Sequence, residues 1–150
     1  MTDTQDAGEV GVRRTEISLT APGPFDFAST AHSHGWCALA PTRWGSEAAA
    51  LHRVERLRSG RVVELRISGA PSRGTRITVQ AQHVGELPGV EQEEIGGIVA
   101  RMFRLTEDLS EFYALCAERG GHWLRLTEGH GRLLCSPTVF EDVIKTTSLQ

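Results

Sequence analysis

The chain has 150 residues, of which 39% are hydrophobic and 23% charged, and its net charge is -3. This apolar fraction and small net charge exclude a chain that is disordered throughout. Surface scaling for this mass predicts that folding buries about two thirds of the surface, enough for one modest domain. No run approaches the ~18 apolar residues of a membrane span, so we expect no membrane partner. Residues 1–12 lack the features of a signal peptide, which predicts a cytoplasmic protein.

Arginine carries nearly all the positive charge, because Lys145 is the single lysine. Residues 51–83 hold seven arginines and two glutamates, whereas residues 91–150 hold ten acids and six bases. A guanidinium pairs bidentately with phosphate, and a basic patch is typical of nucleic-acid binding. The alternative is the solvated outer face of a sheet, since alternate residues of a strand face water in any case.

The first half of the chain has the period-two pattern of strands. Residues 15–20, 51–57, 62–67 and 75–80 alternate polar and apolar side chains and are separated by turns rich in glycine and proline. We therefore predict an antiparallel sheet with one face buried and arginines on the other. Residues 29–34 fit a short helix between the first strand and the others.

Helical periodicity replaces the strand pattern after Pro88 and Gly89. Ile95, Ile98, Val99, Met102 and Phe103 fall on one face of a helix. A second helix is expected from about Thr106, with Leu109, Phe112, Tyr113 and Cys116 buried. A third is expected with Ser136 as its N-cap and Pro137 in its first position. The fold class is α+β, with a flexible tail over residues 1–12, a sheet domain over 13–90 and a partial helical domain over 91–150.

The last expected helix has an apolar face with few residues after it. Phe140, Val143 and Ile144 lie on this face, and the sequence ends at Gln150. We expect these side chains to be partly exposed and to support self-association, because a contiguous apolar patch marks an interaction surface. The alternative is that the helix packs back onto the sheet or onto the two earlier helices.

Three stretches together carry a resemblance to a known family. They are Pro24 to Phe27 (PFDF), residues 98–113 (IVARMFRLTEDLSEFY) and residues 131–146 (GRLLCSPTVFEDVIKT). In this order and spacing they resemble the N-terminal half of the helix-hairpin-helix DNA glycosylases. Within this family they resemble specifically the group of the bacterial 3-methyladenine DNA glycosylase II and the 8-oxoguanine glycosylases. The resemblance runs from about Pro24 to Thr146.

The resemblance implies a fold and a function. It implies a TATA-binding-protein-like sheet domain followed by the first helices of an incomplete helical domain. It also implies base-excision repair of alkylated or oxidised bases in double-stranded DNA, without a cofactor. Residues 147–150 diverge from the family pattern, and the family's hairpin and catalytic aspartate have no counterpart in the chain. We therefore expect a truncated, catalytically silent form with no catalytic residue of its own and weak binding to damaged DNA.

Four residues are candidates for contacts with DNA by this resemblance. His34 and Trp36 follow the first matching stretch, and their rings would suit stacking on a damaged base in a substrate pocket. Lys145 and Thr146 stand where the family's wedge loop begins, which makes them candidates for DNA binding. The alternative for the first pair is that Trp36 belongs to the core and His34 to the surface. We assign Trp44 and Trp123 to the core.

Other groups of residues that could form a metal or catalytic site give only weak signals in the sequence. His32 and His34 precede Cys37, but no second pair with ligand spacing completes a zinc site, so we expect no metal. Cys116 falls on an apolar helix face and is expected to be a small core residue. The alternative function is a non-catalytic α+β module that binds a small ligand or a protein partner.

Overall fold

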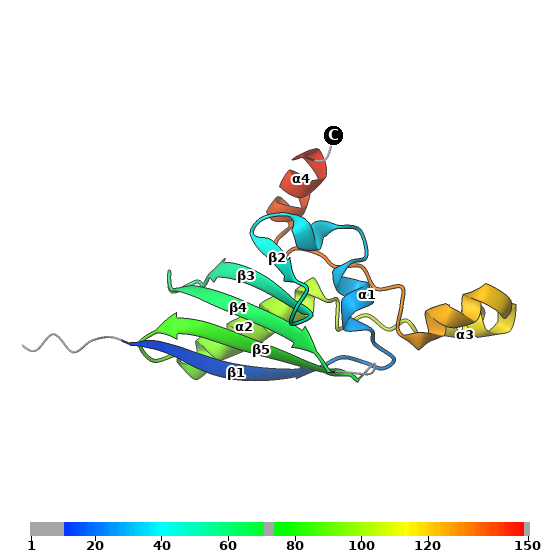
Figure 1. The fold of residues 1–150 in the computed structure, drawn as a ribbon, viewed down its shortest axis with the longest axis horizontal. Helices are drawn as coiled ribbons and strands as arrows, with labels where there is room; N and C mark the ends of the chain where they lie inside the picture. The colour runs from blue at the N-terminus through cyan, green and yellow to red at the C-terminus, as the bar shows by residue number, and fades with distance from the viewer. Residues whose placement is uncertain (1–10, 71–73, 149–150) are drawn as a thin grey trace, which may run out of the picture.

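A computed structural model describes residues 11–70 and 74–148, which form a five-stranded antiparallel sheet and four α-helices (Figure 1). The strand order across the sheet is β1-β5-β4-β3-β2. The strands are β1 (Val12–Thr20), β2 (Thr42–Gly45), β3 (Ala50–Arg56), β4 (Val62–Gly69) and β5 (Arg76–Val84). The helices are α1 (Phe27–Ala31), α2 (Gly89–Met102), α3 (Ser110–Arg119) and α4 (Val139–Ser148). Two 3-10 helices lie between them, η1 (Trp36–Ala38) and η2 (Gly121–Glu128). The expected α+β class and antiparallel sheet are confirmed.

The four strands expected from alternation correspond to β1, β3, β4 and β5, but β2 was missed. This strand has only four residues, too few for a period-two pattern to stand out. It pairs with β3 through the register Thr42 to Arg53 and Trp44 to Leu51. The strand thus exists because β3 offers it a ladder of hydrogen bonds.

The core lies between one face of the sheet and α2. Alternate residues of β4 and β5 are fully buried, among them Leu65, Ile67 and Val79. Ile95 and Val99 of α2 pack into the same buried cluster, and Figure 1 shows α2 running behind the strands. The division into domains at residues 90 and 91 stays a prediction, but α2 shares its core with the sheet.

The helix expected from Thr106 begins four residues later, at Ser110. Residues 103–106 form turns instead, and Arg104 adopts a positive φ of 51°, which ends the helical geometry after α2. In α3 only Cys116 is buried, as expected for a small core residue. The expected burial of Leu109, Phe112 and Tyr113 is wrong, because all three are only half-buried; α3 extends away from the sheet (Figure 1).

The start of α4 differs from the expected cap. Ser136 does not cap the helix: its hydroxyl is buried and has no partner among the described residues. The hydroxyl of Thr138 accepts the backbone N–H of Glu141 at 3.2 Å, and the Asp142 carboxylate accepts the N–H of Ser136 at 2.8 Å. The helix therefore begins at Val139, with Thr138 as its side-chain cap, two residues later than expected.

Two further expectations are settled by exposure. Trp44 packs against the core cluster, as expected, but Trp123 is 38% exposed on η2, so its assignment to the core is wrong. Of the tail expected over residues 1–12, residues 1–10 lie outside the described part, and Val12 already begins β1. Among the described residues, no helix has the length and apolar character needed to cross a membrane.

Candidate functional site

His34 and Trp36 lie next to each other in the connection between α1 and β2. Gly35 separates them with a φ of 82°, a left-handed conformation that turns the chain into η1. The two rings meet edge to face, with their centroids 4.4 Å apart. The imidazole Nε2 of His34 lies 2.6 Å from the carbonyl oxygen of Leu134, which ties this connection to the segment before α4. His34 remains exposed and Trp36 is half-buried.

Lys145 reaches the same place from α4. Its Nζ lies 5.6 Å from the centroid of the Trp36 ring, within the range of a cation–π interaction. The same Nζ lies 2.7 Å from Oε1 of Glu141, one helical turn earlier. Lys145 is only 5% exposed. Thr146 points elsewhere: it is exposed, and its hydroxyl donates to the carbonyl oxygen of Asp142.

An ion-pair network holds α4 to the sheet beside these rings. Arg53 of β3 donates to both carboxylate oxygens of Glu141, at 2.9 and 2.7 Å. Its Nε donates to Glu55 at 2.6 Å. Burial by itself would raise the pKa of Glu141, but hydrogen bonds from Arg53 and Lys145 and their charges outweigh it and lower the pKa to about 2. Burial opposes the charge of Arg53 as well, but Glu141 and Glu55 together raise its pKa.

We call His34, Trp36, Lys145 and Glu141, together with Arg53, the α4 junction. Three of the four site residues selected from the sequence meet here, although more than a hundred residues separate Trp36 from Lys145. Thr146 is not part of the contacts. Sequence reasoning missed Arg53 and Glu141, and strand parity could have found Arg53: it follows Leu51 by two residues and therefore shares its buried face.

Beyond the junction, α4 leaves apolar side chains exposed, as expected. Phe140 is 76% exposed, Val143 is 52% and Ile144 is 48%. Val139 extends the same group with 66%. We call these four side chains the apolar face of α4. The helix is thus held by its polar side, through Lys145 and Glu141, and presents its apolar side to solvent.

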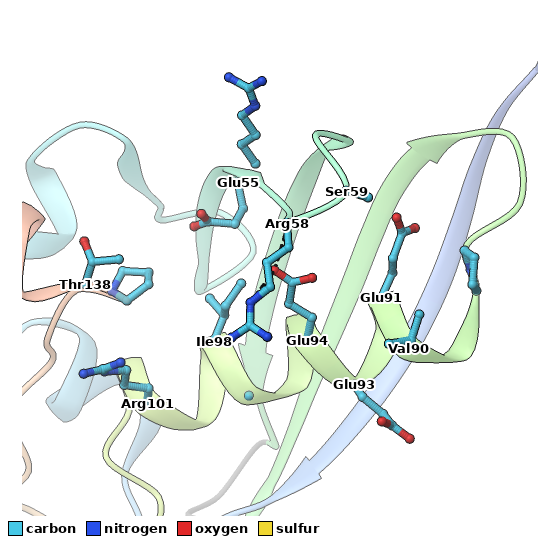
Figure 2. A pocket seen from close by; sticks show the side chains of 14 residues that line it. Glu55, Arg58, Ser59, Val90, Glu91, Glu93, Glu94, Ile98, Arg101 and Thr138 are labelled. Atoms are coloured by element: carbon cyan, nitrogen blue, oxygen red, sulfur yellow. Dashed lines mark hydrogen bonds and ion pairs between the residues drawn. The ribbon is translucent and has the colours of Figure 1, made fainter.

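A hollow of about 860 Å³ lies between α2 and the turn joining β3 to β4 (Figure 2). Two of its acids are engaged by the protein itself: Glu91 pairs with Arg61 at 2.7 Å, and Glu94 accepts the backbone N–H of Arg58 at 2.9 Å. Figure 2 shows the Arg58 side chain lying against Glu94. Part of the charge that lines the hollow is thus already paired within the fold.

A second hollow of about 510 Å³ contains a serine–histidine contact. The hydroxyl of Ser29 lies 2.7 Å from Nδ1 of His130. A serine beside a histidine is the beginning of a nucleophile and base arrangement, which also needs a group to orient the histidine. No such partner of His130 is found among residues 11–70 and 74–148. Gly129 and Gly131 beside it have positive φ values, as expected for a turn.

Two residues of the zinc site considered from the sequence, Cys37 and His32, lie in contact. Cys37 Sγ lies 3.4 Å from Nδ1 of His32. Within the described part of the chain, no group of three or more metal-ligating side chains gathers. Burial raises the pKa of the Cys37 thiol, which keeps it in the neutral form.

Comparisons with protein-family models, curated proteins and solved structures found no match for the chain.

Proposed function

We propose that the chain is the N-terminal part of a helix-hairpin-helix DNA glycosylase of the 3-methyladenine and 8-oxoguanine group, working on DNA in the cytoplasm. Its sheet would be the family's TATA-binding-protein-like domain, and α3 and α4 would be the first helices of the helical domain. In this proposal the chain binds damaged double-stranded DNA weakly through the α4 junction and does not excise a base by itself.

The observation that carries the proposal is the contact of Lys145 with Trp36. The resemblance assigned His34 and Trp36 to a substrate pocket and Lys145 to DNA binding from separate stretches of sequence. In the folded chain, the ammonium of Lys145 lies 5.6 Å from the Trp36 ring and the His34 ring packs on its edge. Any base can stack on an aromatic ring, whatever the nucleotide sequence. Flipping a base out of the duplex costs least when that base is damaged or unpaired.

The state of the carboxylates at the junction supports the absence of catalysis. Glu141 is held by two hydrogen bonds from Arg53 and one contact with Lys145, and its low pKa keeps it ionised. Glu55 is engaged by Arg53 as well. Ionised carboxylates whose charge is already paired with a cation in this way are poorly suited to supporting an oxocarbenium-like sugar or activating water. Lys145, paired with Glu141, is likewise not free to attack as an amine.

Single-turnover excision tests this proposal. The purified chain, in excess, is incubated with duplexes that carry 3-methyladenine, hypoxanthine or 8-oxoguanine. We expect no base release above the uncatalysed background, and binding that weakens steeply with salt. Release of any of these bases would contradict the proposed silence. A borohydride-trapped covalent adduct that disappears in Lys145→Ala would contradict the role given to that lysine.

A second candidate function is favoured by the apolar face of α4. In it, the chain is a non-catalytic α+β module whose exposed Phe140 and Ile144 bind a protein partner, with self-association as the simplest case. Sedimentation and duplex binding separate the two candidates. A chain that self-associates but binds no duplex at low salt would favour the module.

A further inference from the structure

A row of two arginines and a histidine crosses the outer face of the sheet, opposite α2 and the α4 junction. Arg43 of β2 pairs in register with His52 of β3, and His52 pairs with Arg66 of β4. Their neighbours along each strand, such as Leu51, Arg53 and Leu65, are buried, so these three side chains face away from the core. Neighbouring strands are about 4.8 Å apart, which puts the backbones of Arg43 and Arg66 about 10 Å from each other.

The row borders a shallow hollow that is rich in hydrogen-bond donors. It has a volume of about 340 Å³ and is lined by Arg14, His52, Glu64, Arg66, Gln80 and Gln82. The guanidinium of Arg66 lies 3.5 Å from the amide oxygen of Gln80, a long contact. Among residues 11–70 and 74–148, neither Arg14, Arg43 nor Arg66 has a carboxylate within 4.0 Å.

The fold neutralises this charge only in part. His52 lies between the two arginines, and its pKa is lowered by burial first and then by the charges of Arg43 and Arg66, while Glu64 opposes the shift. Glu16 lies at the far end of the row, on β1 beyond Gln80. Glu64 and Glu16 offset two of the three charges of Arg14, Arg43 and Arg66, and Arg56 and Arg76 bring the excess of positive charge among these residues to three.

We infer that the outer face of the sheet binds the phosphate backbone of a nucleic acid through Arg14, Arg43 and Arg66. Guanidinium groups bind phosphate oxygens bidentately. The three arginines come from three different strands and do not converge on one point, which fits a chain of phosphates better than a single anion. Arg56 and Arg76 are exposed on the same face toward its ends.

This surface is separate from the α4 junction. Arg53, which reaches Glu141, projects from the opposite side of β3 to His52. Binding here needs no damaged base and no excision, so the inference does not depend on the proposed glycosylase ancestry. It adds a second contact surface, one that would hold undamaged DNA.

The test compares two triple variants with equal loss of charge. The first carries Arg14→Gln, Arg43→Gln and Arg66→Gln. The control carries Arg101→Gln, Arg119→Gln and Arg125→Gln, which remove exposed arginines from α2, α3 and η2. Anisotropy of a labelled undamaged duplex is measured against salt concentration. Thermal unfolding of both variants checks that they fold.

We expect the outer-face variant to lose about tenfold in affinity at low salt, and its slope of log K against log salt to fall by about 2 to 3, since each phosphate contact contributes about 0.9. We expect the control to stay within about twofold of the unchanged chain. Equal losses in both variants would show an effect of net charge alone and overturn the inference. Unchanged binding by the outer-face variant, or no duplex binding by the unchanged chain, would also overturn it.

Tripolyphosphate as a competitor identifies the source of the phosphates. Displacement of the duplex only at tripolyphosphate concentrations far above those of an unlabelled duplex supports the nucleic-acid assignment. Arginine-dependent binding of tripolyphosphate without binding of the duplex would overturn it in favour of a small-anion site. If the triple variant does not fold, the single variants Arg43→Gln and Arg66→Gln are measured, each with an expected slope change of about 1.

Discussion

Arg53 and Arg66 belong to neighbouring strands of one sheet, yet their side chains have opposite environments. Arg53 faces the core side, is 4% exposed and is bound by two carboxylates. Arg66 faces outward and borders a hollow, and within the described part of the chain it has a long contact with Gln80 and no carboxylate partner. The comparison teaches that strand parity decides which arginines hold the fold together and which are free to bind a ligand. The amino-acid composition alone does not distinguish Arg53 from Arg66.

Removing the partner of the buried arginine should have the largest effect. Glu141→Gln leaves the buried Arg53 without its bidentate carboxylate and Lys145 without its ion pair. We expect the free energy of unfolding to fall by about 3 to 5 kcal/mol, the cost of breaking a buried pair. Chemical denaturation measures it.

The matched control is Glu107→Gln, which removes the partner of Arg104 from an ion pair in which both side chains are well exposed. Its expected cost is about 0 to 1 kcal/mol. Equal losses in the two variants would break the distinction between buried and exposed pairs.

The ion pairs of Glu141 should also make the free energy of unfolding depend on pH. The pKa of Glu141 lies at about 2 in the folded chain and near its ordinary value of 4.5 when unfolded. Because the folded pKa is depressed, the contribution is complete above about pH 4.5 and is lost as the pH falls toward 2. It amounts to about 3 kcal/mol. Urea unfolding at several pH values measures it, and Glu141→Gln should lack this component. Identical pH dependence in both proteins would contradict the assignment.

The apolar face of α4 lies on the side of the helix away from Glu141, and substitutions there should have a different effect. Phe140→Ser combined with Ile144→Ser should change the free energy of unfolding by about 0.5 kcal/mol or less, since both side chains are already exposed. The pair should reduce self-association in sedimentation experiments. Val90→Ser is the control, because Val90 is 71% exposed on α2 and away from this face. A monomeric unchanged chain would contradict the role of this face in self-association.

A small effect on stability is also expected on the outer face. Arg66→Gln removes a charge from the outer face of β4 that no carboxylate contacts among the described residues, and should change the free energy of unfolding by about 0.5 kcal/mol or less. Arg101→Gln on α2 should change it less. A clear loss of stability in Arg66→Gln would mean that this arginine has a structural role after all.

Much of the sheet could be predicted from sequence because alternation is a local signal. The strands containing Leu65 and Val79 were found for this reason, whereas β2 was missed because four residues show no period. The start of α4 was predicted two residues too early, because Ser136 was chosen as the N-cap from its residue type alone. Its hydroxyl is instead buried, and Thr138 caps the helix.

The site was harder to predict than the fold. Trp36 and Lys145 were selected by resemblance, but their contact depends on tertiary structure. Trp123 was assigned to the core because tryptophan usually packs there, yet η2 carries it on the surface. The link from Arg53 to Glu141 spans 88 residues, and no local pattern can indicate such a pair.

The most direct test of the central claim is the affinity ratio between two duplexes, one with an unpaired hypoxanthine and one fully paired. We predict a severalfold preference for the unpaired lesion, which is lost in Trp36→Ala and kept in Trp123→Ala. Trp123 is the matched control because it also packs against a histidine, His122, at 4.8 Å between ring centroids. Equal affinity of the unchanged chain for both duplexes, or a preference that survives Trp36→Ala, would contradict lesion recognition at the α4 junction.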